Sequence, residues 1–179
     1  MRTEPRRHRA RIVSYALGAL LAAALPSSAR AYEDQLGLGV GAGYAYATRE
    51  DSSHHGAFVN LEASLGLSST WSVRGLLGFG HHPQKPRLSE GVLGLEALYL
   101  VDVLEFVPYA GIGVDGLLST PRTHAQIAIG AHPVLGIDWL LDRSFLLGLC
   151  ARPIFMLSQL EHSPLYLSVT LSATWLLDL

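Results

Sequence analysis

The sequence predicts an all-β protein: an eight-stranded antiparallel up-and-down transmembrane β-barrel that follows a cleaved signal peptide. Three observations predict this fold. Apolar residues alternate with small or polar residues over eight long segments, and a period of two is typical of strands. One face of every segment is free of charge. The segments are joined by connections that alternate between short and longer, more polar ones, as in membrane barrels.

The first 31 residues have the pattern of a signal peptide. Arginines crowd residues 2–11, an apolar run follows over residues 12–26, and Ala29 and Ala31 supply the small residues of a cleavage site. The apolar run is shorter than the roughly 20 residues of a spanning helix. An uncleaved anchor helix is the alternative. We assign residues 1–31 to the signal peptide and residues 32–179 to the barrel.

The first four predicted strands cover residues 35–47, 56–67, 71–80 and 90–102. The first has leucine, valine, alanine and tyrosine on one face and, after Gln35, only glycine and alanine on the other. In the next three, the second face carries polar and charged side chains. These are Asn60, Glu62, Ser64, Ser72, Arg74, Glu90, Glu96 and Asp102.

The last four predicted strands cover residues 106–116, 125–140, 145–155 and 165–179. Each again has one face of apolar residues. The opposite face carries Tyr109, Asp115, Gln126, His132, Asp138, Cys150, Arg152, Tyr166, Ser168, Thr170, Ser172 and Thr174. These strands exceed the roughly 9–11 residues that a tilted strand needs to cross a bilayer. Since backbone groups in lipid must be paired, such a sheet must close.

The connections indicate which end of the barrel holds the termini. Residues 68–70, 102–105 and 141–144 are short, whereas residues 48–55, 81–89, 117–124 and 157–164 are longer and polar. With an even number of strands, both termini lie on the side of the short turns, which is the periplasmic side in bacterial membrane barrels.

Aromatic residues on the uncharged face fall near the two ends of the predicted strands. Those beside the short turns or the last strand's end are Trp71, Tyr99, Phe106, Trp139, Phe145 and Trp175. Those near the longer connections are Tyr44, Tyr46, Phe79 and Phe155. Two aromatic girdles at the membrane interfaces are expected from this pattern. A soluble ligand-carrying barrel is the rival fold. It would have to hide eight rows of large apolar residues in a lumen that holds little more than its own side chains.

On these residues the chain resembles the small eight-stranded outer-membrane barrels, which include the transmembrane domain of outer membrane protein A and its relatives X and W. The resemblance spans residues 32–179 and rests on strand count and pattern. It implies a Gram-negative outer membrane, contact with its lipid and lipopolysaccharide, assembly by the barrel-assembly machinery, and a monomer. The family's chains usually end on an aromatic residue, whereas this one ends on Leu179.

The charged face predicts a polar, ion-paired plug in the lumen. Its members are Glu62, Arg74, Glu96, Asp115, His132, Asp138 and Arg152. Glu62, Glu96, His132 and Arg152 are expected at similar heights, with Arg152 at the centre because a guanidinium can bind two carboxylates. The glycines of residues 35–47 are expected to leave space for Tyr109 and Tyr166.

Several functions remain open beside a structural role in the envelope. A narrow ion or small-solute channel and a loop-mediated adhesin or binding protein are the main alternatives. A lipid A-modifying enzyme is less favoured, because adjacent His162 and Ser163 give only a weak catalytic signal. We therefore expect no catalytic residues and no cofactor.

Charge and ligand-forming residues narrow the partners further. The signal peptide carries six Arg and one Glu, a net +5, so the −2 of the whole chain leaves −7 on residues 32–179. That charge argues against nucleic acid. Six histidines, His54, His55, His81, His82, His124 and His162, lie in or beside the long connections. Imidazoles bind zinc, copper or nickel, but nothing in their spacing fixes a site, so no metal site is assigned.

Overall fold

The computed structural model describes residues 34–49, 52–85, 87–101, 105–120, 126–158 and 164–179. The predicted signal peptide, Asp102, His124 and the His162–Ser163 pair lie outside these ranges. Within them, no helix combines the length and apolar character needed to cross a bilayer.

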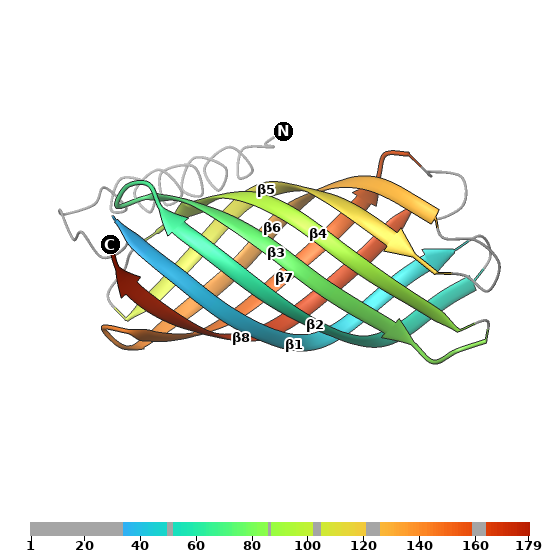
Figure 1. Cartoon of the computed structure of the whole chain (residues 1–179), viewed down its shortest axis with the longest axis horizontal. Helices are drawn as coiled ribbons and strands as arrows, with labels where there is room; N and C mark the ends of the chain where they lie inside the picture. Colours follow the sequence, from blue (N-terminus) through green and yellow to red (C-terminus); the bar gives the residue numbers. More distant parts are fainter. Residues whose placement is uncertain (1–33, 50–51, 86, 102–104, 121–125, 159–163) are drawn as a thin grey trace, which may run out of the picture.

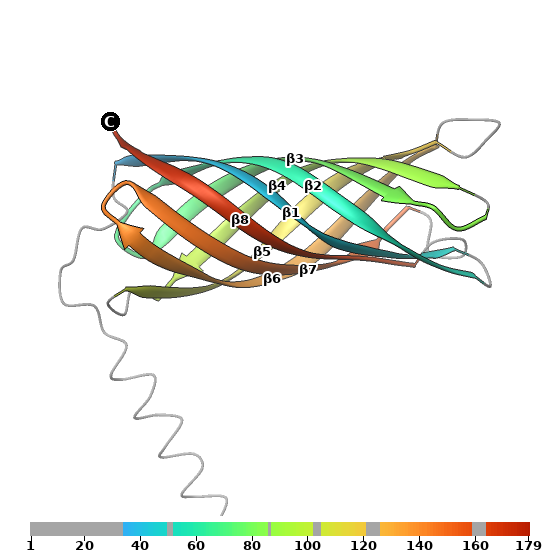
Figure 2. The same ribbon diagram turned by 90° about the horizontal axis from the view of Figure 1, so that it is seen from below.

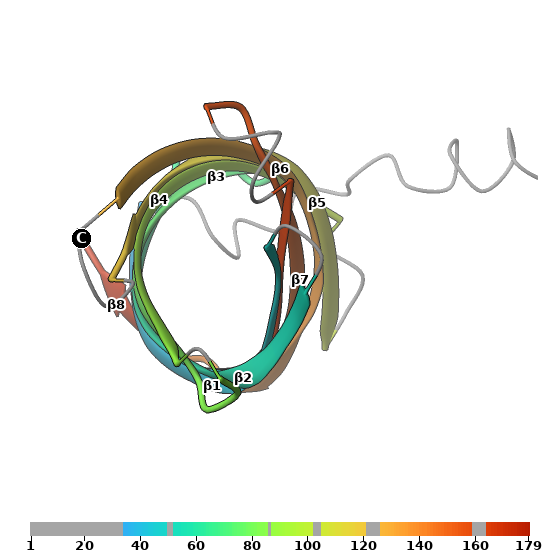
Figure 3. The same cartoon turned by 90° about the vertical axis from the view of Figure 1, so that its right-hand side faces the viewer.

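Eight antiparallel strands form a closed barrel in chain order (Figures 1 and 2). The strands are β1 (Gln35–Arg49), β2 (Ser52–Gly66), β3 (Trp71–His82), β4 (Leu88–Leu100), β5 (Phe106–Ser119), β6 (Gln126–Asp142), β7 (Phe145–Met156) and β8 (Leu165–Asp178). β8 pairs with β1 from Gln35↔Asp178 to Ala47↔Tyr166. The sheet therefore has no free edge, and the view along the axis shows a closed ring (Figure 3). The predicted eight-stranded antiparallel barrel is confirmed.

The two ends of the barrel are distinct. The C-terminus, the start of β1 and the β2–β3 and β6–β7 turns lie at one end, which we call the terminus end (Figure 1). The other end, the loop end, holds the connections around residues 50–51, 83–87, 120–125 and 157–164. The difference in connection length is smaller than the sequence suggests. Residues 48–55 were expected to be a loop, but Thr48 pairs with Ser53 and Arg49 with Ser52, so the strands continue almost to the tip.

Alternate residues point into the barrel and out of it, as the period of two predicts. The outward face is apolar: Ile112 is 72% exposed, and Leu93 and Leu171 are each 67% exposed. The inward face holds the buried charges, with Arg152 only 1% exposed. This distribution is the reverse of that in a water-soluble protein, where charges face solvent.

The structure places aromatic residues of the outward face in contact across neighbouring strands at the terminus end. Ring centroids are 5.4 Å apart for Trp71 and Tyr99. Phe106 and Trp139 stack at 5.8 Å, and Phe145 lies 5.3 Å from Trp175. At the loop end, the outward aromatic side chains are Tyr44, Tyr46, Phe79 and Phe155.

The pairing of β6 with β7 is interrupted near the middle of the barrel. Paired residues stop at Ala131↔Phe155 and resume at Leu135↔Ala151. Pro133 and Pro153 lie within this interruption, one on each strand. Proline has no backbone N–H to donate, so a pair of prolines facing each other removes donors from both strands. We call this interruption the β6–β7 seam.

Candidate functional site in the barrel lumen

Six of the seven residues predicted to form the plug meet at mid-height in the lumen. Together they form what we call the central ionic layer: Glu62 (β2), Arg74 (β3), Glu96 (β4), Asp115 (β5), His132 (β6) and Arg152 (β7). All six are buried, the most exposed being Glu62 at 9%. Each comes from a different strand, so the layer spans six consecutive strands of the barrel wall.

Glu96 is the hub of the central ionic layer. Its Oε2 accepts a hydrogen bond from Arg74 Nε at 2.6 Å, and its Oε1 accepts one from Arg152 Nε, also at 2.6 Å. His132 Nε2 lies 3.1 Å from the same Oε1. The sequence predicts Arg152 at the centre, whereas in the structure both guanidinium groups converge on the carboxylate of Glu96. Charge-assisted bonds of this length are among the strongest in proteins.

Arg152 also reaches the second carboxylate of the layer, as the fork of a guanidinium allows. Its Nη2 lies 3.4 Å from Glu62 Oε2, and its Nη1 donates to Thr170 Oγ1 at 3.2 Å. Glu62 further accepts from Asn60 Nδ2 at 3.3 Å. Arg152 therefore joins two acids from β2 and β4 to the hydroxyl of β8.

His132 lies between two carboxylates. Its Nδ1 is 2.5 Å from Asp115 Oδ2, and its Nε2 faces Glu96. A neutral imidazole can donate from only one nitrogen, whereas the protonated ring donates from both. With His132 protonated, the layer contains three carboxylates and three cations, because the two arginines complete the count. The third acid of the layer is thus balanced only in the protonated form of this imidazole.

Asp138, the seventh predicted residue, stands apart from the layer. It is half-buried nearer the terminus end, where it lines a cavity of about 30 Å³ together with Glu62 and Arg74. Its Oδ1 lies over Gly148, where an added Cβ would come within 2.5 Å. Asp138 is therefore the acid of the lumen that is best placed to remain hydrated.

Apolar side chains fill the lumen on both sides of the central ionic layer. The cluster on the loop-end side comprises Ala45, Ala47, Phe58, Leu76, Leu88, Val92, Leu117, Ala128, Ile154, Met156 and Tyr166. The cluster on the terminus-end side comprises Leu98, Leu100, Val107, Tyr109, Val134, Leu146, Cys150 and Leu176. Few of these residues are among those predicted to fill the lumen, although their alternate positions along the strands already put them inside. The lumen is an ionic layer between two apolar ones.

A second polar group lies in the lumen near the loop end. This loop-end polar group consists of His54, His82, Glu90 and Tyr166. His54 and His82 were expected in or beside loops, but both lie on strands, face inward and are at most 2% exposed. His82 Nε2 is 3.4 Å from Glu90 Oε2, and its ring lies edge-on to those of His54 and Tyr166.

Three members of the loop-end polar group, His82, Glu90 and Tyr166, are buried but poorly bonded. Among the described residues, neither nitrogen of His82 forms a hydrogen bond, nor do Glu90 Oε2 and the hydroxyl of Tyr166. Glu90 Oε1 accepts only a bond of 3.3 Å from Ser119 Oγ. No three His, Cys, Asp or Glu side chains of the described ranges stand where they could hold a metal ion.

The two inward tyrosines occupy different spaces from those expected. The glycines of β1 were expected to make room for them, but an added Cβ at Gly39 would meet Glu62 and Thr174. Tyr109 lies instead over Gly136, and the hydroxyl of Tyr166 lies over Gly80. The prediction was wrong because the stagger between strands, which parity does not reveal, decides which glycine faces which ring.

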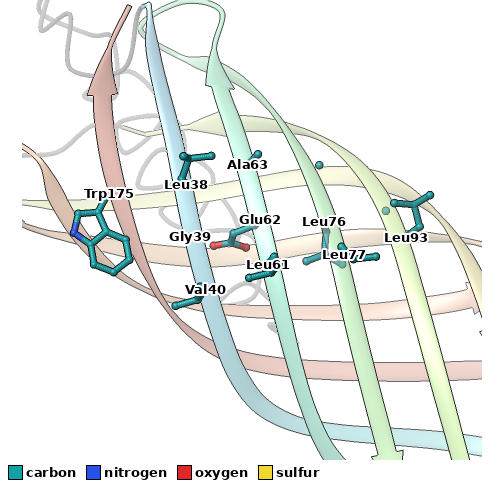
Figure 4. Close-up of a pocket in the computed structure, with 12 residues that line it drawn as sticks. Leu38, Gly39, Val40, Leu61, Glu62, Ala63, Leu76, Leu77, Leu93 and Trp175 are labelled. Carbon is teal, nitrogen blue, oxygen red and sulfur yellow. The ribbon is translucent and has the colours of Figure 1, made fainter.

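A separate groove of about 540 Å³ lies on the outer wall of the barrel. Figure 4 shows its lining from β1 to β4, with Trp175 of β8 beside it. Ala63 and Gly75 pair at its floor, between exposed leucines such as Leu61 and Leu77. The groove is lined mainly by apolar side chains of the outward face, and its lining also includes Glu62 of the central ionic layer.

No protein-family model matches the sequence, and no curated protein matches it. Solved structures match the fold. Neisserial surface protein A aligns with a TM-score of 0.66 and 15% identity, over 80% of this chain and 97% of that one. The outer membrane protein OprG of Pseudomonas aeruginosa aligns with a TM-score of 0.60 and 11% identity, over 84% and 100%. Ail, the attachment invasion locus protein of Yersinia pestis, gives 0.56 and 11%, over 81% and 99%. The chain thus has the fold of small eight-stranded outer-membrane barrels, and fold alone does not set function.

Proposed function

We propose that this chain, which has the fold of the small outer-membrane barrels, is an integral outer-membrane protein with a structural role in the envelope and a lumen closed at rest. The observation that carries the proposal is the reversed distribution of side chains. Large apolar residues cover the outside, where Ile112 is 72% exposed, and the charged side chains that lie away from the strand ends, such as Glu96 and Arg152, are buried inside. So much exposed apolar surface on a monomer is compatible with lipid but not with water.

The closed lumen is supported by its three layers. Water and ions would have to pass two apolar clusters and a layer in which Glu96 already binds two guanidinium groups. An eight-stranded barrel has an interior only wide enough for side chains. A plugged barrel is therefore a better account of this lumen than a channel.

The remaining parts of the proposal concern orientation, partners and chemistry. The terminus end faces the periplasm, the barrel is a monomer inserted by the barrel-assembly machinery, and its partners are the surrounding lipid and lipopolysaccharide. No cofactor, nucleic acid or catalytic role is assigned. Against catalysis, His132 faces Asp115 and Glu96 deep in the lumen, where a lipid substrate would not reach it.

Membrane insertion is tested by refolding the chain into lipid vesicles. A closed barrel should float with the vesicles and change its gel mobility on boiling. Leu171→Arg should cost about 2–4 kcal/mol of unfolding free energy, since it places a cation on the lipid-facing side of β8. Thr170→Arg, whose side chain faces the lumen, should instead respond to packing. Recovery of the chain as a soluble monomer without detergent would contradict the proposal.

Closure is tested by recording currents across planar bilayers. The wild-type barrel should show no large, steady conductance. Arg152→Ala should admit small ions, because it removes the group that joins Glu62 to Glu96. A large, steady wild-type conductance would mean that the lumen is a pore.

A further inference from the structure

We propose that the outward side of β1, β2 and β3 at the loop end binds the headgroup of a phosphorylated glycolipid in the leaflet around it. The binding residues are Tyr44, Tyr46, His55, His81 and the β3–β4 connection with Lys85 and Arg87. We call this surface the rim shelf. The inference rests on the proposed function, because it needs the barrel to cross a bilayer.

The rim shelf lies at the height of a membrane interface. Trp71 of the terminus-end aromatic set and His81 stand ten residues apart on the outward face of β3. At about 3.3 Å per residue and a tilt of about 40°, they are separated by about 25 Å along the barrel axis. That separation equals the apolar band of a membrane barrel, so His81 lies where lipid headgroups begin.

Each outward histidine of the rim shelf is held by a hydroxyl group. The hydroxyl of Tyr44 contacts His55 Nδ1, and Ser89 Oγ lies 3.1 Å from His81 Nδ1. Either partner can be the donor in these two contacts, depending on the histidine tautomer. A neutral ring carries its proton on Nε2 when the hydroxyl donates to Nδ1, and the protonated ring carries a proton on both nitrogens. Among the described residues, Nε2 of His55 and of His81 have no hydrogen-bond partner in the structure. In their protonated form, both exposed rings present an Nε2–H to an anion.

The two histidines are close neighbours on one face. His81 pairs with Ala57 across the β2–β3 ladder, and His55 is two residues from Ala57 on the same side of β2. Diagonal neighbours of this kind lie within reach of a common ligand. One phosphate group, or two on the same headgroup, can therefore meet both donors.

Charge at the two ends of the barrel favours an anionic ligand at the rim shelf. Gln84 Oε1 accepts a hydrogen bond of 3.2 Å from the backbone N–H of His55, which brings the β3–β4 connection beside β2. Lys85 and Arg87 in this connection are exposed cations. Among the described residues, the terminus end instead exposes Asp34, Glu105, Asp142, Asp178 and one cation, Arg143. Phosphate at the loop end complements this distribution.

The hydroxyl groups and rings beside the donors favour a sugar-bearing headgroup over a simple phospholipid. The ring of Tyr46 lies 5.3 Å from that of His55, and its hydroxyl is 3.1 Å from Ser53 Oγ. Amphipathic rings at an interface present an apolar face together with a polar handle. Such a surface can pack against a sugar ring and bond its hydroxyls while the imidazoles bind its phosphate.

The test uses the refolded barrel in phosphatidylcholine nanodiscs, with lipid A as the probe and native mass spectrometry as the readout. Bisphosphorylated lipid A, the same lipid after dephosphorylation, and phosphatidylglycerol are compared. The variants are His55→Gln with His81→Gln, Lys85→Gln with Arg87→Gln, and the matched control Arg143→Gln at the terminus end. Gel mobility before and after boiling confirms a folded, inserted barrel in each sample.

The wild type should retain bisphosphorylated lipid A, and the double histidine variant should bind it about tenfold more weakly, as expected for the loss of a charge-assisted hydrogen bond. The lysine–arginine variant should weaken binding too, and Arg143→Gln should not. Equal retention of the dephosphorylated lipid or of phosphatidylglycerol by the wild type would overturn the proposal. So would equal weakening by Arg143→Gln. A chain that fails to float with lipid or to shift on boiling refutes the proposed function instead.

Discussion

The central ionic layer and the loop-end polar group contain similar residues that are buried to a similar extent, yet their side chains are hydrogen-bonded differently. In the central layer, Glu96 accepts two hydrogen bonds of 2.6 Å from arginines. In the loop-end group, the contacts of Glu90 with other described residues are a 3.3 Å hydrogen bond from Ser119 and an approach of His82 Nε2 to 3.4 Å. The difference shows that burying charged side chains in the lumen is not enough to form a well-bonded plug. Arginine makes the difference, because its fork satisfies carboxylates that an imidazole leaves open.

The largest expected effect comes from removing an arginine of the central layer. Arg152→Ala should lower the free energy of unfolding by about 3–5 kcal/mol, since Glu62 and Glu96 lose a buried partner. Urea titration of the barrel in detergent micelles measures this, followed by the gel-mobility shift. Arg143→Ala in the exposed β6–β7 turn should change stability by less than about 0.5 kcal/mol. Similar losses for both variants would show that the central layer is no better bonded than the surface.

A smaller effect is expected when a carboxylate is neutralised in each region. Glu96→Gln should cost about 3 kcal/mol, because it weakens two charge-assisted hydrogen bonds. Glu90→Gln should cost less than about 1 kcal/mol, since its contacts are long. The same urea titration compares the two nearly isosteric changes. If Glu90→Gln proves as costly as Glu96→Gln, the loop-end polar group has a strong partner at this acid.

The smallest expected effects concern the two inward tyrosines, which are a matched pair. The hydroxyl of Tyr109 accepts a hydrogen bond from Arg74 Nη1 at 3.3 Å, whereas that of Tyr166 has no hydrogen-bond partner within the described part of the chain. Tyr109→Phe should cost about 1 kcal/mol. Tyr166→Phe should be neutral or stabilise by up to about 1 kcal/mol, because it removes an unsatisfied buried group. Thermal unfolding in detergent resolves the sign. A loss at Tyr166 would mean that a water molecule or ligand bonds its hydroxyl.

The fold could be predicted from the sequence because it follows from which residues occupy alternate positions along each strand. A period of two assigns each residue to one face, and a charge-free face with aromatic ends requires lipid outside and a closed sheet. The same parity puts Glu62, Arg74 and Arg152 inside. These inferences use only neighbours along the chain.

The contacts within the site could not be predicted, because they depend on the stagger between strands. Parity does not say that Glu96 of β4, rather than another acid, meets both arginines, or that Tyr109 lies over Gly136. His54 and His82 were misplaced for a second reason. At the loop end, inward polar residues on a strand and polar residues of a loop look alike in sequence, and only the backbone pairing separates them.

The β6–β7 seam has a mechanical consequence for the whole wall. A barrel resists a pulling force while the backbone hydrogen bonds between its strands remain intact. The strand pair with the fewest paired residues is expected to separate first. Where Pro133 and Pro153 interrupt the ladder, Arg152 stands next to Pro153 and ties β7 to Glu96 of β4 and Glu62 of β2 from the inside. Arg152 thus connects β7 to β2 and β4 through the lumen, beside the point where the β6–β7 ladder is interrupted. Under a pulling force, we expect β6 and β7 to separate first at the β6–β7 seam, and at a lower force when the Arg152 side chain is removed.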